Sequence, residues 1–181
     1  MTDAPPPAAL ATTLDRELHW LETLIHQRIE NHMGQGDSAP GVLTLPEPPE
    51  LPGRCAYGAA VTINRLSADE RLALILALAP WLRPQALDLL FVRNANLDRG
   101  FTEFGGRAHG LASGFAPTRQ TALFLLAGDA LDRRLPAMAL FGADGVLVRQ
   151  RLIVLQPDDF APWLPLEPHP ELLARLLRNP G

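Results

Sequence analysis

The chain contains no lysine, because all 16 of its basic residues are arginine. A protein without lysine cannot form a lysine Schiff base, and it lacks the side chain with which a P-loop neutralises nucleotide phosphates. It also has a single cysteine, Cys55, which excludes an internal disulfide and a zinc site built from several thiolates. These absences remove several classes of enzyme and favour a cytoplasmic location.

Long apolar runs and a strong net charge are missing as well. No apolar stretch approaches the roughly 18 residues that span a bilayer, and the start, MTDAPPPAAL, lacks the basic and apolar regions of a secretory signal. The net charge of −4 gives no general attraction to nucleic acid or to an anionic membrane. With 47% hydrophobic and 20% charged residues, the 181-residue chain has the composition of an ordinary globular protein, and we expect no membrane partner.

The N-terminal third divides into three segments. Residues 1–11 are rich in proline and alanine and predict a flexible tail. Residues 12–33 predict a long amphipathic helix, because apolar residues recur at helical spacing. Five prolines in residues 34–56 predict a proline-rich linker, which either wraps over the body or spaces the first helix away from it. Residues 57–181 then form the body.

Capping residues mark the first long helix of that body. Ser67 followed by Glu70 is the pattern of a capping box and predicts a helix over 68–79. This helix is apolar on nearly every side after its first turn, so we expect it at the centre of the domain. Proline at position 80 is expected to end it.

The other expected helices carry similar signals. Thr118 and Gly128 are placed to cap the start and end of a very apolar helix over 119–127. Further helices are expected at 84–94 starting with Pro84, at 129–139 capped by Asp129, and at 170–178.

One segment of the body reads as strand. The sequence FGADGVLVRQRLIVLQ joins an Asp144-Gly145 turn signal to a β-branched run, which predicts a small C-terminal β-hairpin near 140–156. Helices followed by a hairpin are the order of a winged-helix domain. The predicted fold class is therefore mainly α (α+β), with a winged-helix-like helical body.

Residues 100–128 place a glycine-rich loop before the apolar helix and raise the question of nucleotide binding. Gly105 and Gly110 have the glycine spacing of a Walker A motif, but Leu111 and Ala112 stand where lysine and serine or threonine are required. The glycines instead indicate a compact loop with positive φ angles. We expect its polar residues, Glu103, Arg107 and His109, to form a possible docking surface for a partner.

Two kinds of catalytic site are also disfavoured. Ser113 follows G-x-x and does not stand in the G-x-S-x-G elbow that exposes a serine nucleophile. His19, Glu22 and His26 share one helix face, but no fourth zinc ligand is evident. We expect no catalytic residue, no metal and no cofactor, with a serine or zinc hydrolase as a third hypothesis.

DNA binding is the second hypothesis. Arg149 and Arg151 lie on one face of the predicted hairpin and could contact phosphates as in a small winged-helix regulator. The helix that would read the major groove offers only Arg119 and Gln120 at its start. Because that helix is otherwise apolar and the chain is acidic, the sequence favours a protein partner over nucleic acid.

The first helix offers another contact surface. Trp20 and Leu24 lie beside its main apolar stripe and widen it. If this helix does not pack on its own body, it could pair with a partner helix or with a second copy of the chain, which would make a homo-oligomer.

Three segments carry a resemblance to a known family. LSADERLALILALAPWLRPQALDLLFVRN, FTEFGG and GFAPTRQTALFLLAGDALDRRL resemble the N-terminal region of AAA+ ATPases encoded with contractile injection systems, which are phage-tail-like particles. The resemblance extends in order from Thr12 to Leu166 and is most specific at 101–106 and 115–128. In that family a helical, winged-helix-like N-terminal domain precedes the ATPase module.

The resemblance implies a role in recognition. The ATPase module with its Walker motifs is missing from this chain, so no catalytic residue of the family can be carried over. The chain is either an excised N-terminal domain or a stand-alone relative. We therefore expect a non-enzymatic interaction or adaptor domain whose partner is an injection-system component, a cargo or an AAA+ module, acting in particle assembly or partner engagement.

Overall fold

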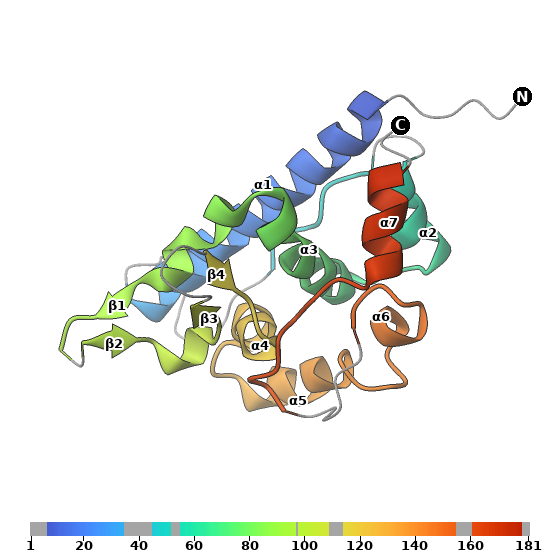
Figure 1. Ribbon diagram of the computed structural model, residues 1–181. Coiled ribbons are helices and arrows are strands. Elements are labelled where there is room, and N and C mark those ends of the chain that lie inside the picture. The colour runs from blue at the N-terminus through green and yellow to red at the C-terminus, as the bar shows by residue number, and fades with distance from the viewer. Residues whose placement is uncertain are drawn as a thin grey trace, which may run out of the picture.

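A computed structural model describes residues 7–34, 45–51, 55–96, 98–108, 114–154 and 161–178, without the side chains of residues 7, 8, 107 and 108. The described chain is mainly helical, with small antiparallel strand pairs. The long helix α1 (Pro7–His32) lies across one side of the molecule, and the other helices gather beneath it (Figure 1). This confirms the mainly α fold class at the coarse level.

Helix α1 begins earlier than the sequence predicted. Residues 7–11, expected in the flexible tail, form its first turns, and Leu10 is already buried in the core. Proline suits the first helical position, since its missing N–H would have no partner there and its φ is already helical. Residues 1–6 of the predicted tail lie outside the described part of the chain.

Helix α3 (Ala68–Leu82) forms the centre of the core, as predicted. Its capping box is confirmed, with Ser67 N donating to Glu70 Oε2 at 2.8 Å, and every residue from Leu72 to Ala79 is buried. The prediction that Pro80 ends it was wrong, because the helix continues to Leu82, three residues past the predicted end at Ala79. The helix ends before Pro84, because a residue preceding proline is driven out of the α region, and Arg83 has φ −153° and ψ 77°.

After α3 the chain forms short elements. The expected helix over 84–94 is a 3-10 helix, η1 (Pro84–Phe91), followed by strand β1 (Arg93–Asn94). β1 pairs antiparallel with β2 (Arg99–Gly100), and the two project from one end of the molecule (Figure 1). After η2 (Thr102–Phe104), strand β3 (Arg107–Ala108) pairs antiparallel with β4 (Phe115–Ala116).

The two glycines between η2 and β3 are required by the backbone. Gly105 and Gly106 have φ angles of 63° and 80°. A Cβ on Gly105 would lie 2.7 Å from Thr118 Oγ1, and one on Gly106 would overlap the ring of Phe115. The compact loop predicted from the glycines is therefore present, and it sits directly against the start of the next helix.

Helix α4 (Arg119–Ala127) is buried along almost its whole length, as predicted. Gly128 ends it with φ 55°. Arg28 of α1 reaches this end, and its Nε and Nη2 donate to Leu125 O at 3.0 and 2.6 Å. Burial lowers the pKa of Arg28 to about 10, so the guanidinium is still charged at neutral pH and stabilises the carbonyl end of α4.

The remaining helices are α5 (Leu131–Ala139), α6 (Val146–Arg149) and α7 (Pro170–Arg178). The C-terminal helix has the predicted bounds. Helix α5 starts one residue later than a cap at Asp129 would place it, because Ala130 occupies the capping position.

The β-hairpin predicted near 140–156 was wrong for the described residues, which reach 154. Gly145 starts helix α6 instead of closing a hairpin turn, and Leu147 is fully buried. The β-branched run that follows pairs with the C-terminal segment, since Ile153 forms an antiparallel bridge with Pro168 and Val154 N donates to Glu167 O at 3.0 Å. Whether β-branched residues form a strand depends on the segments they pack against, and here those segments are distant in sequence.

The described part of the proline-rich linker wraps over the body. Trp20 Nε1 donates to Pro46 O at 2.9 Å, and Arg71 Nη2 donates to Pro49 O at 2.9 Å. The chain then enters helix α2 (Ala56–Ile63), which the sequence did not predict. Residues 45–51 therefore wrap over the body and do not space the first helix away from it.

One continuous core joins these elements. Helix α1 contacts α2, α3, η1 and α4, and α7 closes the side of the core formed by α2. In the described residues no single helix is long and apolar enough to cross a membrane; α3 and η1 together would be by length and composition, bent by 105°.

Candidate functional site

The first helix does not offer the predicted contact surface. Trp20 and Leu24 are 5% and 0% exposed, because α1 packs on its own body with both sides of its apolar stripe. The condition for pairing with a partner helix or a second copy through these residues is not met.

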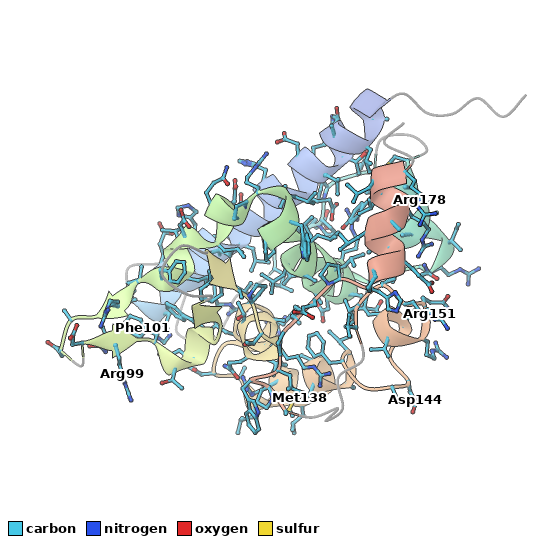
Figure 2. The ribbon with its side chains drawn as sticks, viewed as in Figure 1. Arg99, Phe101, Met138, Asp144, Arg151 and Arg178 are labelled. Carbon is cyan, nitrogen blue, oxygen red and sulfur yellow. The ribbon has the colours of Figure 1, made fainter. Side chains whose placement is uncertain are left out.

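The arginines assigned to DNA binding lie in a different setting from the one expected. Arg149 is exposed at the end of α6, and Arg151 follows it with its Nη1 2.6 Å from Glu171 Oε1 (Figure 2). Arg119 is buried, with its guanidinium carbon 6.0 Å from the centre of the Phe141 ring. The hairpin on which these residues were placed is replaced by a helix.

Of the predicted docking residues on the glycine-rich loop, Glu103 is the one whose side chain is described. Its Oε1 lies 2.8 Å from His32 Nε2 at the end of α1. The His32 ring makes edge contacts with Phe101, Phe104 and Phe124, so an aromatic cluster surrounds the ion-pairing group. Arg107 is described through its backbone in β3, and His109 and Ser113 lie outside the described residues.

Of the residues weighed as metal ligands on α1, His19 and His26 are exposed and Glu22 is half-buried. His19 Nδ1 lies 3.9 Å from Glu22 Oε2, and His26 points to solvent. Within the described ranges, no group of three or more histidine, cysteine, aspartate or glutamate residues is placed to hold a metal ion.

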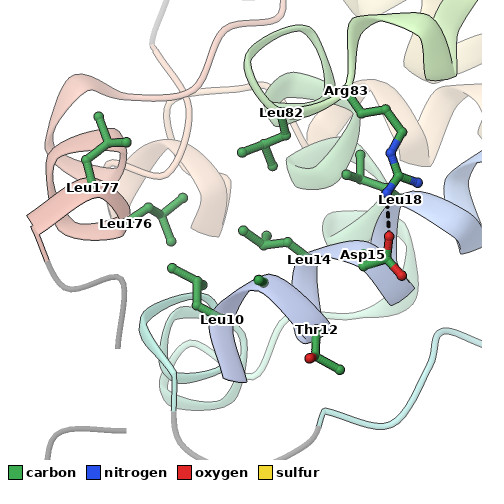
Figure 3. A pocket seen from close by; sticks show the side chains of 10 residues that line it. Leu10, Thr12, Leu14, Asp15, Leu18, Leu82, Arg83, Leu176 and Leu177 are labelled. Carbon is green, nitrogen blue, oxygen red and sulfur yellow. Dashed lines mark hydrogen bonds and ion pairs between the residues drawn. The ribbon is translucent and has the colours of Figure 1, made fainter. Parts of the chain in front are cut away.

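A groove lined by leucines opens where α1, the end of α3 and α7 meet (Figure 3). We call it the leucine groove, and its volume is about 720 Å³. It is lined by Leu10, Ala11, Thr12, Leu14, Asp15, Leu18, Leu82, Arg83, Leu176 and Leu177.

The charged residues of the leucine groove neutralise each other. Arg83 forms ion pairs with Asp15 and with Glu22, whose Oε1 is 3.4 Å from Arg83 Nη1. The hydrogen bond that Arg83 donates to Asp15 is the main reason that the pKa of Arg83 is raised. Apart from Thr12, the rest of the lining is apolar, and Leu177 at its edge is 77% exposed.

A second pocket, of about 620 Å³, is built on the glycine-rich loop. We call it the indole pocket, because Trp163 forms one wall and is 64% exposed. Its lining consists of Thr102, Glu103, Gly105, Gly106, Thr118, Gln120, Pro162 and Trp163.

Hydrogen bonds at the start of α4 hold the indole pocket together. Gln120 N donates to Pro162 O at 2.6 Å, which joins the C-terminal segment to the helix. The Gln120 side chain donates from Nε2 to Glu103 O at 2.8 Å, and Thr118 Oγ1 accepts from Gly106 N at 3.2 Å. The glycine-rich loop and the segment around Pro162, which are distant in sequence, therefore both form walls of the pocket at the start of α4.

A third cluster of polar groups is closed to solvent. Glu17 and Tyr57 are fully buried, with Tyr57 OH donating to Glu17 Oε2 at 2.7 Å, and Arg71 forms an ion pair with Glu17. All three groups are buried in the described part of the chain. It ties α1, α2 and α3 together, and apart from the single tyrosine no local pattern in the sequence predicts it.

No protein-family model, curated protein or solved structure matches this chain.

Proposed function

We propose that this chain is a non-enzymatic protein-interaction domain acting in the cytoplasm, whose leucine groove receives an apolar helix of a protein partner. The observation that carries the proposal is the groove itself: leucines from three helices converge on an open, neutralised surface (Figure 3). Two of these leucines, Leu82 and Leu177, are 39% and 77% exposed, and exposed apolar surface is typical of docking sites for other proteins.

The shape of the groove suits a helix. Leu10, Leu14 and Leu18 recur every four residues along α1 and form the base of the groove over about 12 Å, which is roughly two helical turns, with their own side chains buried. An amphipathic partner helix could lay anchors spaced three or four residues apart over this base, against the exposed Leu82 and Leu177. Arg83 and Asp15 already satisfy each other, so the partner would not have to pair a buried charge there.

The resemblance to injection-system AAA+ ATPases supplies the partner classes: a particle component, a cargo or an AAA+ module. We also propose that the fold of this chain is winged-helix-like. In its support, α3, η1 and α4 occur in the predicted order, whereas α6 stands where the wing was expected.

The test is direct binding between the purified chain and purified proteins encoded by its neighbouring genes. We expect at least one to bind with a micromolar or tighter Kd, and Leu177→Glu to weaken that binding at least about tenfold by placing a charge in the apolar groove. The control is Leu135→Glu on α5, a leucine that is 69% exposed and does not line the groove.

Binding that survives Leu177→Glu unchanged would refute the role of the groove. Hydrolysis of ATP at a rate that follows the purified protein through successive columns would refute the non-enzymatic assignment.

A further inference from the structure

We propose that the indole pocket binds the guanidinium group of an arginine side chain presented by a peptide or protein partner. This inference is independent of the leucine groove, which involves other residues. It rests on two residues that line one pocket and are both open to solvent: Glu103, whose side chain is 36% exposed, and Trp163.

Glu103 is the charged residue in the lining of this pocket. Its Oε1 is held by His32, and since a carboxylate accepts hydrogen bonds at both oxygens, Oε2 can accept from a second donor. A guanidinium has five N–H donors in one plane and forms strong charge-assisted bonds to carboxylates.

Trp163 supplies the second half of the recognition. Trp163 is 64% exposed, and indole is the best aromatic face for a cation. The planar guanidinium can stack on this ring while its edge faces a carboxylate, which a lysine ammonium cannot do as well.

The walls of the pocket are fixed before any ligand arrives. Gln120 holds the main chain of Glu103 on one side and of Pro162 on the other. The main chain at Gly105 approaches Gln120 so closely that an added Cβ would lie 2.8 Å from Gln120 Cβ. A preorganised pocket loses little conformational entropy on binding.

One cation lies close to this pocket and sets the expected selectivity. Arg134 of α5 donates from Nη2 to Gln120 Oε1 at 2.5 Å, outside the lining itself. Its charge, and that of His32 when protonated, offset part of the field of Glu103. Charge alone therefore gives weak attraction, and stacking on Trp163 has to favour arginine over lysine.

The experiment follows the three tryptophan indole N–H signals of the ¹⁵N-labelled full chain by NMR. The probe is the peptide acetyl-Gly-Arg-Gly-amide, and the comparison peptides carry lysine, glutamine or glutamate at the central position. We expect the Trp163 signal to shift saturably with the arginine peptide, with a millimolar Kd, as suits a single side chain. The signals of buried Trp20 and exposed Trp81 serve as internal controls, since neither residue lines the pocket.

Variants at two positions, Glu103 and Trp163, separate charge from stacking. Glu103→Gln keeps an acceptor for His32 and removes the charge, so we expect arginine binding about tenfold weaker. The matched control is Asp144→Asn, an exposed acid on the side of the molecule opposite Phe101 (Figure 2), which should leave the Kd unchanged. Trp163→Phe should weaken binding less than Trp163→Ala, with the amide signals of Gly105 and Gly106 as readout.

The proposal is overturned if the arginine peptide leaves the Trp163 signal in place, or if the glutamine or glutamate peptide shifts it equally. Unchanged binding in Glu103→Gln also overturns it. Leu177→Glu should still bind the peptide, so failure here is distinguishable from failure of the leucine groove.

Discussion

At the scale of single residues, the buried cluster of Glu17, Tyr57 and Arg71 is the most demanding feature of the chain. A buried carboxylate is tolerated only when it is paired and hydrogen-bonded, and Glu17 receives bonds from both partners. Burial, together with the adjacent Glu17 charge, raises the pKa of Tyr57 well above its usual value of 10. The cluster therefore makes the free energy of unfolding depend on pH in the alkaline range.

Tyr57→Phe tests this dependence. At pH 7 we expect the free energy of unfolding to fall by about 1–2 kcal/mol, because Glu17 loses a donor. In the parent chain, stability is fully present below pH 10 and falls as pH rises above it, since the unfolded tyrosine releases its proton before the folded one. Urea unfolding at pH 8 and pH 10.5 should show this fall in the parent and a smaller one in the variant.

The single tyrosine gives a direct check. Phenolate absorbance of the native chain should appear well above pH 10, or only as the protein unfolds. Ionisation of the folded chain near pH 10 would contradict the buried hydrogen bond.

At the scale of elements, α1 and α4 depend on each other. Arg28 gives two hydrogen bonds to Leu125 O, at the end of α4 where carbonyl groups lack partners within the helix. Because α4 is short and apolar, this contact fixes both its end and the position of α1 over it.

Arg28→Met should remove these bonds while keeping most of the aliphatic contact. We expect the free energy of unfolding to fall by about 1–3 kcal/mol, the cost of leaving a buried carbonyl unpaired. Arg16→Met, at an exposed position of the same helix, is the control and should change it by less than about 0.5 kcal/mol. Equal effects of the two substitutions in urea unfolding would show that the Leu125 contact contributes nothing.

At the scale of the whole molecule, α1 and the body share one core. Leu21 of α1 and Leu125 of α4 are both fully buried in it, and residues 45–51 lie across the same surface. The sequence suggested a first helix, a linker and a body. These segments follow one another along the chain, but their described residues pack into the same core.

Leu21→Ala and Leu125→Ala should each lower the free energy of unfolding by about 2–5 kcal/mol. Helical circular dichroism and tryptophan fluorescence should follow one shared transition in both variants, as expected for a single cooperative domain. The exposed Leu135→Ala is the control. A separate early loss of helix signal in Leu21→Ala would show that α1 unfolds independently of the body.

The sequence by itself determined the features that depend on near neighbours. Ser67 and Glu70 fixed the start of α3, Gly128 the end of α4, and the glycines of the loop its positive φ angles. These follow from local backbone chemistry, which acts over a few residues.

Only the tertiary structure decided the contacts between distant segments. It turned the predicted hairpin into α6 and a bridge from Ile153 to Pro168, and it buried Trp20 instead of exposing it. It also brought Trp163 to Glu103, and α7 to the leucines of α1. Turn and strand signals give a local preference of about 1 kcal/mol, whereas burial of a large apolar side chain contributes about 1.5–3 kcal/mol and depends on partners that no local pattern reveals.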